Sequence, residues 1–247
     1  MRNFLLTLLF DGGAYHGWQV QENAVTVQET LQNAAERILG ARCPVTGCSR
    51  TDAGVHALGF CCCLRAETGL SPERLQAALN AVLPRDIAVG GCREVPLTFH
   101  PRYDCRRKTY RYLVWNGKTR NPFYEGRACF YPYRLDAPFL HAQAQAFCGK
   151  HDFSAFCAAN GSVEDKVRTI YAFSVEREGD LVRFTVTGDG FLYNMVRILV
   201  GTLLDLQAGR LEAGSLPAVL ESRDRARAGA TAPAEGLYLV RADYADI

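Results

Sequence analysis

The sequence lacks the signatures of several common enzyme classes. None of its ten cysteines forms a Cys-x-x-Cys pair, so the usual spacing of structural zinc ligands is missing. It contains no glycine-rich phosphate-binding loop and no nucleophile elbow of the serine-hydrolase type. No low-complexity segment or long linker interrupts the chain. The sequence therefore indicates no metal and no cofactor.

The chain also has little net charge and no long uninterrupted apolar run. A formal net charge of +2 over 247 residues leaves any phosphate-binding surface to local clustering of cations. The apolar N-terminal run, residues 1–10, lacks a small-residue cleavage site and meets an acidic, glycine-rich turn, which favours a buried strand over a signal peptide. The run Phe191–Leu206 is short and is interrupted by Asn194, Arg197 and Asp205, so we expect no membrane span.

Cysteine is plentiful, but its placement is that of a small hydrophobic residue. The triplet Cys61-Cys62-Cys63 lies inside an apolar run, where its members cannot alternate cleanly as disulfide partners. We interpret the cysteines as reduced and mostly buried, as in proteins of a reducing compartment. The expected location is the cytoplasm.

Apolar periodicity and capping signals predict an alternation of strands and helices in both halves of the chain. In the first half we expect strands at 4–10, 43–48, 59–64 and 86–95, a helix at 27–39 ending at Gly40, and a second helix from the N-cap Ser71 to about Leu83. In the second half we expect strands at 109–115 and 237–244, a hairpin of 169–177 and 181–187, and helices at 136–148, 191–206 and 216–221.

This order predicts an α+β fold of two ferredoxin-like (RRM-like) halves. The first half, residues 1–104, carries the loop around Asp52, and the second covers residues 105–247. We expect their antiparallel sheets to meet at a central basic cleft lined by residues 99–108, because ligands prefer clefts between domains.

The most informative segment is Gly47–Ala57, which places Arg50, Asp52 and His56 around a glycine turn. Asp52 fits an ordinary tight turn, because aspartate tolerates turn geometry. It equally fits a nucleophile or base on a rigid loop, with small neighbours that let a substrate approach. Arg50 would contact phosphate or hold the Asp52 carboxylate ionised. Gly54 argues against a helix, so His56 is expected to position backbone or contact RNA.

A second segment, Phe99–Tyr112, interleaves cations with aromatic rings. It fits a solvated edge strand protected by charge. The pattern favours nucleic-acid binding instead, because arginines would hold phosphates while a tyrosine stacks on a splayed-out base. Strand alternation places Lys108, Tyr110 and Tyr112 on one face.

The predicted helix over 191–206 is apolar except for a stripe of Asn194, Arg197, Gly201 and Asp205. The stripe faces either water or the groove, where Arg197 would meet a carboxylate. The sequence leaves both possibilities open.

These segments together resemble the tRNA pseudouridine synthase A family over nearly the whole chain. The matching stretches are Phe10–Gly12, Gly17–Gln19, Val27–Glu29, Ser49–Ala57, Asn80, Leu83–Ala88, Phe99–Tyr103, Lys108–Tyr112, His151–Phe153, Val167–Ile170, Gly190–Arg197 and Ala234–Leu239. The Arg-Thr-Asp-Ala-Gly core of the fourth stretch is the most specific of them.

The resemblance implies an isomerase that converts uridines at positions 38–40 of the tRNA anticodon stem-loop into pseudouridine. By the same resemblance, Asp52 is the nucleophile, Arg197 pairs with its carboxylate and Tyr110 packs on the target base. It further implies a homodimer that works without metal or cofactor. The RNA-contacting residues would be Phe99, His100, Pro101, Arg102, Tyr103, Arg106, Arg107 and Lys108, together with the loop of Ser162, Val163, Glu164, Asp165 and Lys166.

Two other functions fit parts of the sequence. A non-catalytic RNA-binding module would use the same basic segment without Asp52 chemistry. A metal-dependent hydrolase would use Asp52, His56, His100 and Asp104 as ligands and catalysts.

Overall fold

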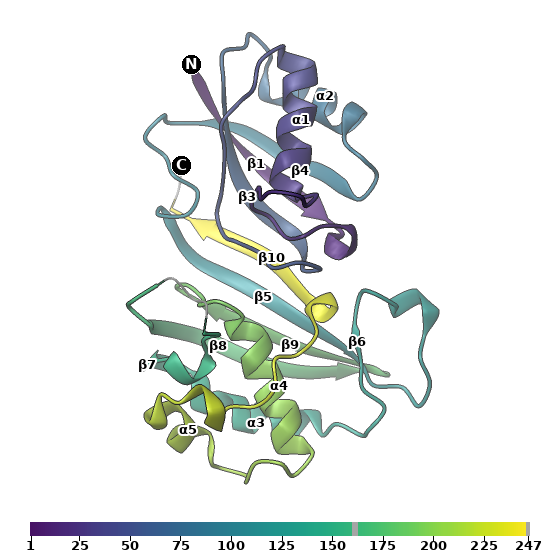
Figure 1. Cartoon of the computed structure of the whole chain (residues 1–247), viewed down its shortest axis with the longest axis vertical. Helices are drawn as coiled ribbons and strands as arrows, with labels where there is room; N and C mark the ends of the chain where they lie inside the picture. The colour runs from purple at the N-terminus through teal and green to yellow at the C-terminus, as the bar shows by residue number, and fades with distance from the viewer. Residues whose placement is uncertain (160–162, 246–247) are drawn as a thin grey trace. The chain divides into compact units, whose positions relative to one another are not determined.

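The computed structural model describes residues 1–159 and 163–245. The fold is mixed α+β, with a mostly antiparallel sheet and few helices (Figure 1). The chain forms two compact units. Unit 1 comprises residues 1–106 together with 238–247, and unit 2 comprises residues 107–237. The expected second half ran from 105 to the C-terminus, whereas in the structure the final segment returns to the first unit.

Unit 1 has the strand order β4-β1-β3-β10, with β2 also paired to β3. Their bounds are Arg2–Phe10 for β1, Val45–Gly47 for β2, His56–Ala66 for β3, Ile87–Val95 for β4 and Leu237–Tyr244 for β10. All pairings are antiparallel except that of β10, whose Tyr238 lies opposite His56 in a parallel ladder. Figure 1 shows β10 in yellow beside β3. The strand that ends the chain thus borders the start of β3, directly after the Asp52 loop.

Helices α1 (Val27–Leu39) and α2 (Pro72–Val82) pack against each other in unit 1. Both begin directly after a capping residue, because the Thr26 hydroxyl accepts from the Glu29 N–H and the Ser71 hydroxyl accepts from the Arg74 N–H. Helix α1 ends at Gly40, whose left-handed φ of 74° suits glycine. The fully buried core of the unit includes Phe4, Leu6, Leu8, Leu31, Phe60 and Leu64.

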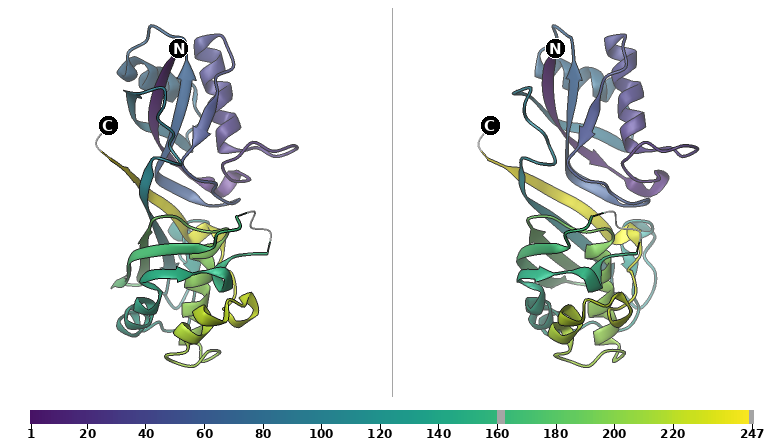
Figure 2. Two further views of the ribbon diagram at one scale, coloured as in Figure 1. Left: turned by 90° about the vertical axis from the view of Figure 1, so that its left-hand side faces the viewer. Right: turned by 60° about the vertical axis from the view of Figure 1, so that its left-hand side comes forward.

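Unit 2 has the strand order β5-β9-β8-β7, with β6 joined in parallel to the end of β5. The strands are β5 (Cys105–Trp115), β6 (Cys129–Phe130), β7 (Gly149–Asp152), β8 (Val167–Glu178) and β9 (Leu181–Gly188). Helices α3 (Ala137–Ala144), α4 (Met195–Gln207) and α5 (Leu216–Ser222) lie together on one side of these strands (Figure 2). The fully buried rings of the unit include Tyr112, Phe147, Phe153, Phe156, Phe173 and Phe184.

Two helices are shorter than the sequence predicts. Helix α4 was expected from Phe191 but begins at Met195, because Asn194 adopts a left-handed φ of 59° that no α-helix can contain. Helix α3 ends at Ala144, and residues 145–147 tighten into a 3₁₀ turn before Cys148. In both places a local backbone change overrides an apolar pattern that continues through it.

The interpretation of the cysteines agrees with the structure. All ten are free, and seven are buried. Burial raises the pKa of the Cys63 thiol to about 12, so this group stays protonated and unreactive at neutral pH. No helix within residues 1–159 and 163–245 combines the length and apolar character needed to cross a bilayer.

Candidate active site

Asp52 lies on a tight turn between β2 and β3. The Val55 N–H donates to the Asp52 carbonyl oxygen at 3.2 Å, and Gly54, the third residue of this turn, has a φ of 77°. That positive φ is what a type II turn requires, and glycine adopts it without strain. The Asp52 residue is half-buried. The tight turn that the sequence suggests is therefore present, and it positions Asp52 just before the start of β3.

A glycine-rich loop, residues 11–18, packs directly on this turn. The Trp18 N–H donates to the Thr51 carbonyl at 3.1 Å, and the Gly54 N–H donates to the Tyr15 carbonyl at 3.2 Å. The approach is so close that a Cβ on Gly17 would lie 2.3 Å from the Thr51 carbonyl oxygen. Backbone held by backbone in this way leaves the Asp52 turn little freedom, which is the preorganisation that a catalytic group needs.

We predict that Gly17→Ala displaces the Asp52 turn. Its φ of 83° and the clash with Thr51 should destabilise the protein by about 2–4 kcal/mol. A shift of about 1 Å at Asp52 should lower turnover roughly 100-fold. Gly40→Ala is the matched control, because Gly40 has a similar φ of 74° but open space around it. Denaturant unfolding and turnover measure both effects, and equal losses in the two variants would contradict the proposed packing role.

His56 contacts the glycine-rich loop of residues 11–18 through a buried side chain. Its side chain is only 2% exposed. Its Nδ1 accepts the Gly12 N–H at 3.0 Å, an Asp11 carboxylate oxygen lies 3.1 Å from the same atom, and the ring stacks on Tyr238 at 4.7 Å. Because Nδ1 accepts from Gly12, it does not at the same time donate to Asp11. The structure thus agrees with a backbone-positioning role for His56.

Two aromatic residues complete the support and were given no role by the sequence analysis. The Trp18 ring stacks on Phe60 at a centroid distance of 4.2 Å. The Tyr15 hydroxyl donates to Asp86 at 2.7 Å, and burial, reinforced by that hydrogen bond, raises the pKa of Tyr15. The signal that could have identified them is the pair of glycine turns directly after the first strand. Arg50, by contrast, is exposed beside the turn, where its guanidinium is accessible to a phosphate.

The loop of residues 99–104, which leads into β5, is held by internal contacts although much of it is exposed. The His100 N–H donates to the Asp104 carboxylate at 2.8 Å, and the His100 Nδ1 accepts from the Arg102 N–H at 3.1 Å. The His100 ring stacks on Tyr103 at 4.2 Å, and Tyr103 remains 77% exposed. Arg102 is also exposed. This loop therefore presents an aromatic ring and a cation in a fixed arrangement.

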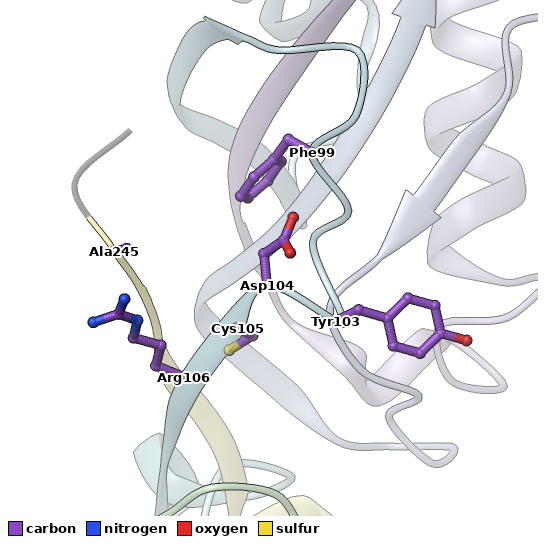
Figure 3. A pocket seen from close by; sticks show the side chains of 6 residues that line it. All are labelled: Phe99, Tyr103, Asp104, Cys105, Arg106 and Ala245. Carbon is purple, nitrogen blue, oxygen red and sulfur yellow. The ribbon is translucent and has the colours of Figure 1, made fainter.

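Phe99 and Pro101 anchor the loop rather than face solvent. Both are buried, the Phe99 ring meets Tyr244 edge-on at 5.1 Å, and the Tyr244 hydroxyl donates to the Pro101 carbonyl at 2.8 Å. A cavity of about 400 Å³ opens beside them. Its lining residues are Phe99, Tyr103, Asp104, Cys105, Arg106 and Ala245 (Figure 3). Figure 3 shows the Arg106 guanidinium and the Tyr103 ring extending in opposite directions from the start of β5 at Cys105.

Strand β5 separates its cations into exposed and buried ones. Arg106 and Arg107 are exposed, and the Arg107 guanidinium lies 5.8 Å from the centre of the Tyr171 ring. Lys108 and Tyr110 are buried on the face that they share with Tyr112, as strand alternation predicts. The Tyr110 ring meets Phe191 edge-on at 5.1 Å. The two arginines are therefore accessible to RNA, and the RNA contact expected of Lys108 stays a prediction.

The polar stripe of α4 packs against backbone of the protein itself. It binds the backbone of residues 229–232 in the same unit. The Arg197 Nε donates to the Ala232 carbonyl at 2.7 Å and Nη1 to the Asn194 side-chain oxygen at 2.7 Å. The Ala230 N–H donates to the Asp205 carboxylate at 2.9 Å, and a Cβ on Gly201 would lie 1.8 Å from the Ala230 carbonyl oxygen. The stripe therefore fixes the orientation of the Arg197 guanidinium.

The remaining predicted contact loop is only partly described. Ser162 lies outside the described residues. Val163, Glu164 and Asp165 are exposed, and the Asp165 carboxylate accepts the Val167 N–H at 2.9 Å. The Lys166 carbonyl accepts the Phe153 N–H at 3.0 Å. Its contact with RNA stays a prediction. Among the described residues, no group of three or more histidine, cysteine, aspartate or glutamate side chains is arranged to hold a metal ion.

Comparison with known proteins gives a consistent result. A family model described as tRNA pseudouridine synthase matches residues 7–104 and 143–245. A protein of Acetivibrio thermocellus named tRNA pseudouridine synthase A is 46% identical over 244 residues, which cover 99% of this chain and 100% of that protein. One of the same name from Ruminiclostridium cellulolyticum is 43% identical over 245 residues, with the same coverage of both chains. Among solved structures, a Cbf5-Nop10-Gar1 complex matches with a TM-score of 0.41 and 13% identity, over 95% of this chain and 57% of that chain.

Proposed function

Because the chain belongs to the tRNA pseudouridine synthase family, we propose that it isomerises uridines at positions 38–40 of the tRNA anticodon stem-loop. The enzymes of this family are isomerases that act on tRNA, and the chain has that activity. The observation that most supports the proposal is the rigid placement of Asp52 on a glycine-supported turn. The specific positions in tRNA come from the family resemblance.

The proposed chemistry is redox-neutral and needs one nucleophile. The target uridine leaves the base stack, and the bond between N1 and the C1′ carbon of the sugar breaks. The uracil then rejoins C1′ through C5, the proton on C5 is released to solvent, and N1, no longer bonded to the sugar, takes up a proton. Asp52 assists by attacking either C1′ or C6 of the ring, and each route regenerates the free carboxylate at the end. A carboxylate serves at neutral pH only if it stays ionised, and a neighbouring guanidinium favours that state.

The other site residues divide the remaining tasks. Within the proposal, the two ferredoxin-like halves expected from the sequence both act on one uridine, which binds in a basic cleft. Arg197 pairs with the Asp52 carboxylate, while its bonds to Ala232 and Asn194 set its orientation. Tyr110 packs on the extruded base, which offsets part of the few kcal/mol that flipping costs. A homodimer in the cytoplasm completes the proposal and rests on the family resemblance alone.

The exposed cations of the two segments would hold the tRNA backbone. The proposal assigns this task to Arg50, Arg102, Arg106 and Arg107, all of which are exposed. Tyr103 adds an exposed ring for stacking on an unpaired base. Phe99, His100 and Pro101 contribute by holding this loop in shape, through the bonds and ring contacts described above.

The position of the product tests the function most directly. Purified protein is incubated with an unmodified tRNA transcript, and pseudouridine is mapped by nucleotide. We expect it at positions 38–40 that carry uridine and nowhere else, and we expect tRNA from cells lacking the protein to lose it there. Pseudouridine at other positions would refute the site assignment, and none at all would refute the substrate.

The salt dependence of binding tests the arginines of β5. Replacing Arg106 and Arg107 together by glutamine should make the plot of log affinity for tRNA against log salt shallower by about 1.5, since each phosphate contact contributes roughly 0.7–0.9. Arg42→Gln is the control, because Arg42 is ion-paired with Glu36 at 3.1 Å. A double variant with the slope of the wild type would exclude these contacts.

A further inference from the structure

The segment Asn116–Arg134, here called the aromatic loop, has no part in the function argued above. It connects β5 to the start of α3, contains β6, and lies outside the residues that the family model matches. In Figure 1 it forms the teal excursion around β6. It contains the rings of Phe123, Tyr124, Phe130, Tyr131 and Tyr133.

Three of these rings are exposed to solvent to different degrees. Phe123 is 85% exposed, Tyr133 is 72% exposed and Phe130 is 37% exposed. A single exposed apolar residue needs no explanation, but a cluster of aromatic rings on one short excursion marks an interaction surface. Packing does not require an aromatic side chain at position 123, because Phe123 is almost fully exposed to solvent.

The loop is rigid in spite of this exposure. The Asn116 side-chain amide donates to the Tyr131 carbonyl at 2.6 Å and to the Tyr133 carbonyl at 2.8 Å. The Trp115 ring stacks on Tyr124 at 4.9 Å, and Trp115 Nε1 donates to the Thr119 carbonyl at 2.8 Å. Because the backbone is already fixed, little conformational entropy is lost when the exposed rings bind a partner.

The charge of the loop identifies the chemistry of that partner. The aromatic loop carries four cations, Lys118, Arg120, Arg127 and Arg134, against one carboxylate, Glu125, in a chain whose net charge is only +2. Exposed rings among cations suit a polyanion with flat faces, which is the chemistry of unpaired nucleotides.

We propose that the aromatic loop binds unpaired nucleotides of the tRNA substrate, apart from the uridine that reacts. Phe123 stacks on a base, and the neighbouring cations hold the adjacent phosphates. The inference rests on the proposed function, since it takes tRNA as the substrate. It adds a contact surface in unit 2 whose role is affinity rather than chemistry.

Two substitutions of Phe123 separate stacking from simple apolar contact. Phe123→Leu keeps an apolar side chain but removes the π face, whereas Phe123→Tyr keeps the π face and adds a hydroxyl. We expect Phe123→Leu to weaken binding of full-length tRNA roughly tenfold and Phe123→Tyr to leave it unchanged. Turnover at saturating tRNA should equal that of the wild type in both. Because the side chain is 85% exposed, thermal unfolding should not change.

Other outcomes would overturn the inference. If wild type and Phe123→Leu bound tRNA with equal affinity, Phe123 would not stack on a base. A second outcome would be that both variants bind tRNA normally, while Phe123→Tyr but not Phe123→Leu changes the sedimentation of the protein. That result would identify the surface as an interface between copies of the chain. The test is independent of the proposed function, because affinity is measured without turnover. A wild type that binds tRNA but forms no pseudouridine would refute the function and leave the comparison of the two variants valid.

Discussion

Asp52→Asn is expected to abolish pseudouridine formation while tRNA binding persists. Asparagine has the shape of aspartate and keeps the turn, but its amide is not a nucleophile at neutral pH. Removing the reacting group of an enzyme typically lowers kcat by about 10⁴-fold or more. Tritium release from tRNA labelled at C5 of uridine measures the loss, because the proof of reaction is the departure of that hydrogen.

Glu67→Gln provides the matched control for this substitution. Glu67 is an exposed carboxylate of the same unit whose side chain lies 3.7 Å from the N-terminal amino group. It should release tritium at the rate of the wild type. If Asp52→Asn retained comparable tritium release, the chain would still bind tRNA but its chemistry would have to originate at another residue.

Arg197→Met is expected to have the second-largest effect. Methionine keeps an unbranched apolar stem but removes the cation that the proposal pairs with Asp52. Loss of one positioned charge in an active site typically lowers kcat by about 10²–10³-fold. The KM for tRNA should change little, because the proposed contact is with the nucleophile and not with the substrate. Steady-state kinetics on an unmodified transcript separate the two constants.

The substitution also removes two structural hydrogen bonds, so stability must be followed with activity. Arg197 donates to the Ala232 carbonyl and to Asn194, and their loss should lower the free energy of unfolding by about 1–3 kcal/mol. Arg210→Met is the control, because Arg210 follows the same helix and pairs with Asp205. Equal activity losses in the two variants, or a rise in KM alone, would contradict the role assigned to Arg197.

Much of the fold followed from local signals. Helix α1 has the predicted bounds, because its apolar residues recur at helical spacing and Gly40 ends it. Strand β10 also has its predicted bounds, since a run of alternating apolar residues closes the chain. Pairing was harder to anticipate. That β10 returns to β3 in unit 1 depends on contacts between residues about 180 positions apart, such as Tyr238 and His56, to which no local pattern points.

The residue types of the candidate site could be predicted from the sequence, but the contacts that hold them in place could not. The residue types around Asp52 and along β5 were visible in the sequence, and the RNA contact of the exposed Arg106 and Arg107 stays a prediction. The close packing of Gly17 on Thr51 was not visible, because a clash avoided in space leaves only a glycine in the sequence. The α4 stripe was likewise ambiguous, since its partners are backbone atoms of residues 229–232.

The central claim is that Asp52 acts on the uridine on which Tyr110 packs. The most direct measurement is a crystal structure of Asp52→Asn bound to an unmodified tRNA, in which the reaction cannot proceed. The account predicts the target uridine outside the base stack, with its C1′ or C6 about 3–3.5 Å from the substituted side chain at position 52 and its ring against Tyr110. A target uridine still paired in the stem, or bound beyond reach of position 52, would contradict it.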